Sequence, residues 1–235
     1  MSCASCPGVL ASLPCFLTCT RHDVVPLQAA EQAAAKSKYA GKLTMDFLEE
    51  RVGHRFFEHL RELDLSGFRL RDLGDIFHRE EFAHLRELNL DNNFLTDVSS
   101  LARLTNLCAL RLNHNRLDNH PMFDEAAAAA EYGAAGGGDK APPCYDSLEV
   151  LQMGHCGITA LPSLGLHHMR YSLRVLFLQD NDLTKVEGLD TLANLQELVL
   201  DRNKIKFLDV NSLAGLVHLQ VCSLASTWQR ALFSS

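Results

Sequence analysis

One leucine pattern recurs six times along this chain of 235 residues. Each copy has leucine or another apolar residue at its first, fourth, sixth and eleventh positions, and most copies have asparagine or cysteine at the ninth. The copies begin at Leu60, Leu85, Leu107, Leu148, Leu173 and Leu195. Because one copy cannot bury its own leucine face, the pattern predicts that the copies stack around a single continuous core.

The middle of each copy alternates apolar and polar residues, which predicts a short strand with leucine on its buried face. The ninth residue lies where the strand turns. An asparagine amide there offers a donor and an acceptor to backbone groups that would otherwise be buried without partners. Cys156 takes this position in the fourth copy and Phe68 in the first. We therefore expect the first copy, which lacks one neighbour, to turn differently.

This pattern resembles the leucine-rich repeat, and the resemblance implies an α/β solenoid with a concave parallel β-sheet. After Leu95 and Leu183, apolar residues recur at every third position, which suits a 3₁₀ or helical convex side. That tail is similar to short intracellular leucine-rich repeats, typified by a regulatory subunit of protein phosphatase one. Residues 186–198 resemble long, cilium-linked members of the same subfamily. However, units of 25 residues (Leu60 to Leu85) depart from a pure 22-residue array.

The segments outside the repeats divide the chain further. Residues 1–42 are predicted to be a disordered leader, and residues 43–59 an amphipathic N-terminal cap helix. The repeats span 60–224, with a low-complexity insertion at 119–146 that is rich in alanine and glycine. Residues 225–235 are an atypical tail, interpreted either as a lid on the last repeat or as part of a truncated array. The apolar positions of the cap helix are Leu43, Phe47, Leu48, Val52, Phe56 and Phe57.

Charge and apolar runs restrict the compartment and the partner. The net charge of −7 argues against nucleic acid or an acidic membrane surface as the main partner. The chain lacks a run of 18 apolar residues, so no transmembrane helix is expected. Residues 7–18 are apolar, but no Lys or Arg precedes them and Pro14 interrupts them, which argues against a signal peptide. We predict a cytoplasmic location with reduced cysteines, and the resemblance extends this to the cilium or axoneme.

The sequence contains no P-loop, no nucleophile elbow, no zinc-protease helix motif and no dinucleotide-binding glycine motif, so neither an enzyme nor a cofactor is predicted. Cys3 and Cys6, followed by Cys15 and Cys19, have a spacing that could ligate zinc tetrahedrally. The residues between the two pairs provide no strand or helix framework. We therefore expect a disordered leader without a metal site.

The remaining candidate is the predicted concave face, formed by residues between the buried leucines. Its N-terminal half is acidic, whereas Val150, Val175, Phe177 and Val199 form an apolar patch. The predicted function is a non-enzymatic interaction scaffold that binds a protein, as a monomer or within a larger complex. The alternatives are a phosphatase regulatory subunit, or an ordinary surface with scattered apolar residues. The predicted partner-binding residues are Phe177, Val175, Val199, Arg111, Gln152, Asp64 and Asp91.

Overall fold

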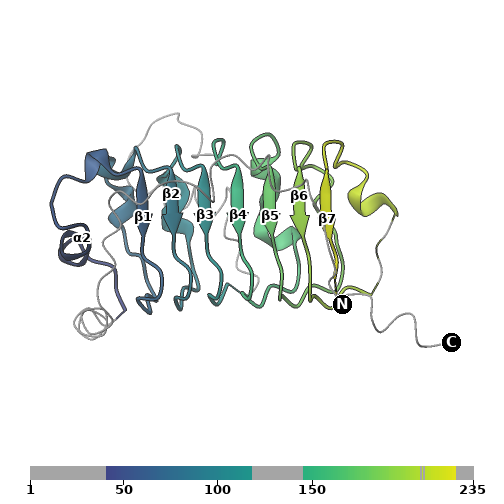
Figure 1. Ribbon diagram of the computed structural model, residues 1–235, viewed down its shortest axis with the longest axis horizontal. Helices are drawn as coiled ribbons and strands as arrows, with labels where there is room; N and C mark the ends of the chain where they lie inside the picture. Colours follow the sequence, from purple (N-terminus) through teal and green to yellow (C-terminus); the bar gives the residue numbers. More distant parts are fainter. Residues whose placement is uncertain (1–40, 118–144, 207, 209, 226–235) are drawn as a thin grey trace, which may run out of the picture.

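The computed structural model describes residues 41–117, 145–206, 208 and 210–225. Within them, seven three-residue strands pair in parallel and in chain order (Figure 1). The register keeps equivalent residues of successive copies side by side, for example Leu63 beside Leu88. The predicted solenoid with a parallel sheet is confirmed. The strands are β1 (Glu62–Asp64), β2 (Glu87–Asn89), β3 (Ala109–Arg111), β4 (Val150–Gln152), β5 (Val175–Phe177), β6 (Glu197–Val199) and β7 (Val221–Ser223).

The chain returns from strand to strand on the opposite side of the core, through turns and short 3₁₀ helices. Single 3₁₀ turns fit here because they are compact enough to stack at the spacing of the strands. The predicted 3₁₀ convex side is confirmed. These segments are η2 (Ile76–His78), η3 (Glu80–Phe82), η4 (Ser99–Arg103), η5 (Pro162–Leu164), η6 (Leu166–Met169) and η7 (Val210–Leu213).

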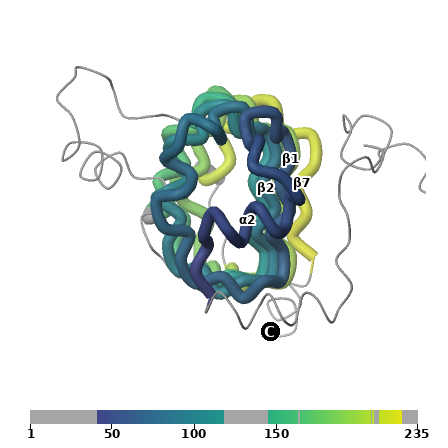
Figure 2. The backbone as a smooth tube through the Cα atoms, turned by 90° about the vertical axis from the view of Figure 1, so that its left-hand side faces the viewer, coloured from purple at the N-terminus to yellow at the C-terminus, as the bar shows by residue number. Residues whose placement is uncertain are grey.

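An α-helix, α2 (Met45–Val52), lies at the N-terminal end of the sheet (Figures 1 and 2). The Thr44 hydroxyl caps it by accepting a hydrogen bond from the N–H of Phe47, and it ends at Gly53, which adopts the left-handed conformation (φ 84°). The prediction of one helix over 43–59 is therefore too long. Gly53 stops it, and Phe56 is 75% exposed rather than on the apolar face. Phe57 is buried, but in a separate 3₁₀ turn, η1 (Phe57–His59).

The helix explains the unusual turn of the first copy. Phe68 occupies the ninth position, where later copies have asparagine, and its ring meets the Phe47 ring of α2 edge to face, with centroids 5.0 Å apart. Arg51 of α2 also donates from Nε to the carbonyl of Asp64. An asparagine here would have no preceding strand turn to bond, so an apolar residue that packs against the cap takes its place.

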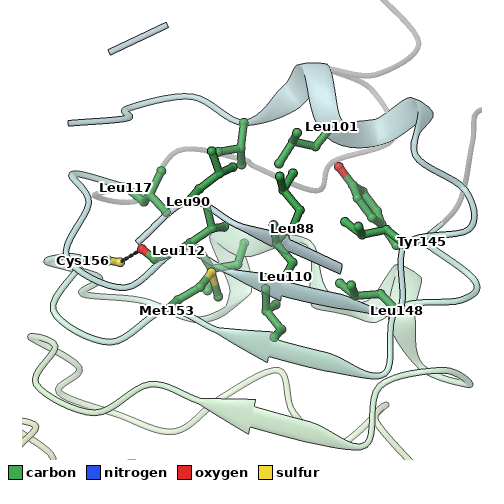
Figure 3. Close-up of a cluster of buried hydrophobic side chains, with 14 of the residues drawn as sticks. Leu88, Leu90, Leu101, Leu110, Leu112, Leu117, Tyr145, Leu148, Met153 and Cys156 are labelled. Carbon is green, nitrogen blue, oxygen red and sulfur yellow. Dashed lines mark hydrogen bonds between the residues drawn. The ribbon is translucent and has the colours of Figure 1, made fainter. Parts of the chain in front are cut away.

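Stacked leucines from successive strands form the core (Figure 3). Tyr145 joins them and is 4% exposed, so the predicted insertion at 119–146 is two residues too long at its C-terminal end. The physical reason is a position that most copies share: an apolar residue three before the first leucine packs into the core, and its carbonyl accepts the N–H of that leucine. Tyr145 does this for Leu148, as Phe82 does for Leu85.

Asparagines at the ninth position join adjacent turns. Asn181 accepts from the N–H groups of Cys156 and Ile158 and donates to the carbonyls of Met153 and Leu178. The residue immediately before each of these asparagines has positive φ, for example His114 (58°) before Asn115. Turn residues with left-handed backbone thus aim the amide into the core, where it satisfies buried backbone groups.

Cys156 fills the asparagine position of the fourth copy differently. Its thiol donates to the carbonyl of Leu112 at 3.2 Å, as an asparagine Nδ2 would (Figure 3). Backbone N–H groups of Asn115 and His114 also approach the sulfur. The N–H of Leu117 donates to the backbone carbonyl of Cys156, also at 3.2 Å. The substitution therefore keeps the donor bond to the preceding copy, and the acceptor of the Leu117 N–H moves from side chain to backbone.

The ends of the solenoid refine the predicted boundaries. The prediction assigns Gly41 and Lys42 to the leader. However, the carbonyl of Gly41 accepts the N–H of Arg71, and the backbone of Lys42 forms an isolated parallel β-bridge with that of Asp72. At the other end Cys222 occupies the buried-leucine row but is exposed, since no further turn stacks on β7 among the described residues. The cysteine pairs at 3–19, residues 119–144 of the insertion and residues 226–235 of the tail lie outside the described residues.

Candidate protein-interaction face

The residues on either side of each buried strand leucine lie on the face of the sheet opposite the core, here named the outer sheet face. One row follows the position before that leucine, from Glu62 to Val221, and a second row follows the position after it, from Asp64 to Ser223. Because the strands pair in register, neighbours in a row come from successive copies. A partner that lies along one row, across the strands, would therefore contact one residue from each copy.

The apolar part of this face is a strip formed by Val175, Phe177 and Val199. Val175 and Phe177 flank Leu176 on β5, and Phe177 pairs in register with Val199 on β6. All three are half-buried, so part of each side chain remains accessible to a partner. Val150 is buried at 8% exposure and adds little to the accessible surface. The predicted patch is thus smaller and more firmly packed than the sequence indicated.

Gln152 and Arg111 extend the row of Phe177 towards the N-terminus. The register runs from Arg111 on β3 to Gln152 on β4 and then to Phe177, so Gln152 separates the arginine from the strip. Arg111 acts instead on the acidic side: burial raises the pKa values of Glu87 and Asp91, and the charge of Arg111 opposes part of that rise. Of the predicted partner-binding residues, Gln152 therefore adjoins the apolar strip and Arg111 does not.

The acidic candidates have structural hydrogen bonds. Asp64 accepts the N–H of Ser66 at 2.9 Å, and Asp91 accepts the N–H of Asn113 on the next copy at 2.7 Å. Burial raises the pKa of Asp91, although the hydrogen bonds from Asn113 and the charge of Arg111 oppose that rise. Asp91 therefore joins two turns, and its carboxylate is only partly available to a partner.

Two carboxylates beside the strip were not counted in the predicted site. Glu197 lies between Val175 and Val221 in register, and burial raises the pKa of its carboxyl. Asp201 accepts the Ser223 hydroxyl at 2.7 Å. Both residues lie within the sixth copy, at its third and seventh positions, so comparing equivalent positions between neighbouring copies could have placed them beside the strip.

A second cluster lies along the turns at one edge of the sheet. The rings of His114 and His155 stack with centroids 4.2 Å apart, and His155 Nε2 lies 3.0 Å from Asp180 Oδ2. Arg202 donates to both carboxylate oxygens of Asp180. The hydrogen bond from Arg202, aided by the charge of His155, holds the pKa of Asp180 below its ordinary value. The sequence analysis missed this cluster, although all four residues share the eighth position of their copies.

The described residues contain no group of three or more His, Cys, Asp or Glu side chains placed to hold a metal ion. Within the same part of the chain, no helix is long and apolar enough to cross a membrane. The outer sheet face and its edge therefore present three features: an apolar strip, its flanking carboxylates and the turn cluster.

Comparison with known proteins agrees with this geometry. A family model described as "Leucine Rich repeats (2 copies)" matches residues 58–103 and again 172–220. Together with the repeat pattern and the stacked parallel sheet, this match shows that the chain contains leucine-rich repeats. Proteins of this class typically bind protein partners without catalysing a reaction.

Two solved structures are similar to the chain. The first is the leucine-rich repeat ectodomain of the plant membrane receptor kinase GASSHO1/SCHENGEN3 from Arabidopsis thaliana, in complex with CASPARIAN STRIP INTEGRITY FACTOR 2. It is 21% identical with a TM-score of 0.43, over 62% of this chain and 16% of that chain, so this chain spans a small part of the ectodomain. The second is internalin C2 from Listeria monocytogenes, 21% identical with a TM-score of 0.35, over 83% of this chain and 92% of that chain.

Proposed function

We propose that this protein is a non-enzymatic scaffold that binds a protein partner on its outer sheet face. The observation that carries the proposal is the apolar strip of Val175, Phe177 and Val199, which the register makes continuous across β5 and β6. Half-buried side chains on a rigid sheet lose little conformational entropy on binding, so contact area there converts efficiently into affinity. An aromatic residue at the centre of such a strip is a typical anchor.

The surroundings of the strip indicate the chemistry of the partner. Glu197 sits between two valines of its row, and burial alone accounts for its raised pKa. A carboxylate that is already partly desolvated gains more from a cation than one in open water. We therefore propose that the partner presents an apolar anchor to Phe177 and a Lys or Arg side chain to Glu197.

A comparative pull-down tests the proposal. The wild-type protein and two variants, Phe177→Ala and Tyr171→Ala, serve as baits, and retained proteins are quantified by mass spectrometry. Tyr171 is the matched control, because its ring is 72% exposed but lies outside the outer sheet face. We expect a partner that wild type and Tyr171→Ala retain and Phe177→Ala loses, by roughly 2 kcal/mol of binding free energy. A partner retained equally by all three would place the binding surface elsewhere.

A second candidate function is regulation of a protein phosphatase. The apolar triplet spacing after Leu95 and Leu183, with the 3₁₀ segment η4 in the first of these tails, favours it through its similarity to the phosphatase regulatory subunit. The 25-residue units weigh against it. Purified catalytic subunit of protein phosphatase one should bind the scaffold directly if this candidate holds. Failure of the purified proteins to associate would remove it while leaving the scaffold proposal intact.

We also propose a cytoplasmic location, at the cilium or axoneme in ciliated cells. Support comes from Cys156, whose thiol must stay reduced to donate to Leu112, and from residues 186–198, which resemble long ciliary members such as leucine-rich-repeat-containing protein nine. Imaging a fluorescent fusion in ciliated cells tests the location. Light scattering after gel filtration tests whether the protein is a monomer or part of a larger complex, and secretion of the fusion would refute the location.

A further inference from the structure

A cavity of about 390 Å³ opens on the turns that follow the first strands. Its lining residues are Arg71, Phe94, Thr96 and Arg116, none of which belongs to a strand. The volume falls within the range of small-molecule sites in proteins. This cavity is therefore separate from the outer sheet face and can be considered independently of the proposed scaffold function.

Three successive copies build the cavity. Phe94 and Thr96 come from the second copy, while Arg71 comes from the first and Arg116 from the third. Backbone hydrogen bonds hold these turns side by side, from the N–H of Phe94 to Leu70 and from the N–H of Arg116 to Leu95. Strands of a sheet lie about 4.8 Å apart, so two strand spacings place the backbones of the two arginines at least about 10 Å apart. The arginines thus form two walls with an aromatic ring and a hydroxyl between them.

The charged groups that line this cavity are two guanidinium groups. The Arg116 guanidinium lies over the Phe94 ring at 5.3 Å, which holds it in place, and Phe94 is 36% exposed. Within the described part of the chain, neither Arg71 nor Arg116 forms an ion pair. Among the described residues, two carboxylates adjoin the lining residues in sequence, and both cap their own turns: Asp72 accepts the N–H of Gly74, and Asp97 accepts the N–H and hydroxyl of Ser99.

We propose that this cavity binds an oxyanion carried on an aromatic or aliphatic stem, with Arg71 and Arg116 on the anion and Phe94 against the stem. A guanidinium group presents paired N–H donors that match the oxygens of a phosphate or carboxylate. The Thr96 hydroxyl supplies one further donor. Phosphate monoesters and carboxylates share this chemistry, and either can be a modified or acidic side chain of a protein.

Titration of the full chain with four small probes tests the site, with binding followed by NMR chemical shifts or calorimetry. The probes are phenyl phosphate, benzoate, inorganic phosphate and phenol. We expect phenyl phosphate or benzoate to bind several-fold more tightly than inorganic phosphate, and phenol not to bind. The tighter of the first two identifies phosphate or carboxylate as the preferred anion. Equal binding of phenol, or no binding of either aromatic anion at millimolar concentration, would overturn the proposal.

Three variants locate the binding. Arg71→Ala and Arg116→Ala should each weaken the aromatic anion at least tenfold, and Phe94→Ala should abolish its advantage over inorganic phosphate. Arg170→Ala is the matched control, because Arg170 also lies over an exposed ring, Tyr171, at 4.5 Å, but does not line this cavity. Unchanged binding in Arg71→Ala and Arg116→Ala, or an equal loss in Arg170→Ala, would overturn the assignment. All lining residues are exposed, so unfolding of the variants is not expected and circular dichroism checks it.

Discussion

Asn181→Ala removes an amide that serves four backbone groups on two neighbouring turns. Its oxygen accepts two N–H groups at 3.0 and 3.1 Å, and its nitrogen donates to two carbonyls at 2.8 and 3.0 Å. Asn181 is 4% exposed, so water reaches these groups poorly after the truncation. Each hydrogen bond contributes about 1 kcal/mol net, so the variant should lose about 4 kcal/mol of unfolding free energy.

Urea unfolding followed by circular dichroism measures this loss. Asn194→Ala is the matched control: the Asn194 amide makes one exposed hydrogen bond, to the carbonyl of Tyr171, and its removal should cost about 1 kcal/mol or less. Asn181→Cys should fall between the two variants. The fourth copy shows that a thiol at this position keeps a donor, through Cys156 and Leu112, whereas the N–H of Leu117 has to use a backbone carbonyl in place of the amide oxygen.

The reasoning fails if Asn181→Ala and Asn194→Ala unfold at the same urea concentration. The asparagine positions would then be a marker of the repeat without a large share in its stability. It also fails if Asn181→Cys is less stable than Asn181→Ala, because a retained donor cannot then be what makes cysteine acceptable at the ninth position.

Three further outcomes follow from the packing and the charges. Leu176→Ala should lower the unfolding free energy by roughly 2–5 kcal/mol in urea titrations, because it leaves a cavity in the stacked core. In the folded protein, iodoacetamide should modify Cys222, which is exposed, and spare Cys156, because burial raises the pKa of that thiol to about 12; peptide mapping distinguishes the two. Arg202→Ala should raise the pKa of Asp180 towards its ordinary value in carbon-detected NMR titrations. Since the native pKa is lowered, this ion pair stabilises the fold above the ordinary carboxyl pKa and ceases to do so as the pH falls through the lowered value.

The sequence predicts the architecture well because each copy repeats the same contact. Leu88 must meet Leu63 and Leu110 if the copies stack at all, so the strands, their order and their buried face follow from spacing alone. The end of the cap helix was missed, although Gly53 gives a local signal for it. Tyr145 was also missed, because the apolar position three before each first leucine was not compared between copies.

The candidate site was harder to predict because exposure depends on neighbours that are distant in sequence. The alternation along β5 correctly places Phe177 on the face opposite the core. Its neighbours in register, however, are Gln152 and Val199 of the adjacent copies, and these limit its exposure. Arg111 belongs to the same row but lies two strands from Phe177. The pattern therefore predicts which face a side chain lies on. How much of it a partner can reach depends on packing across the copies.

Photo-crosslinking tests the proposed interaction face most directly. A benzophenone side chain is introduced in place of Gln152, which is next to Phe177 in register, and, as the control, in place of His167 in the 3₁₀ segment η6. After irradiation with the partner from the pull-down, we predict a covalent adduct from position 152 that disappears when Phe177→Ala is added. An adduct from position 167 with none from position 152 would contradict binding on the outer sheet face.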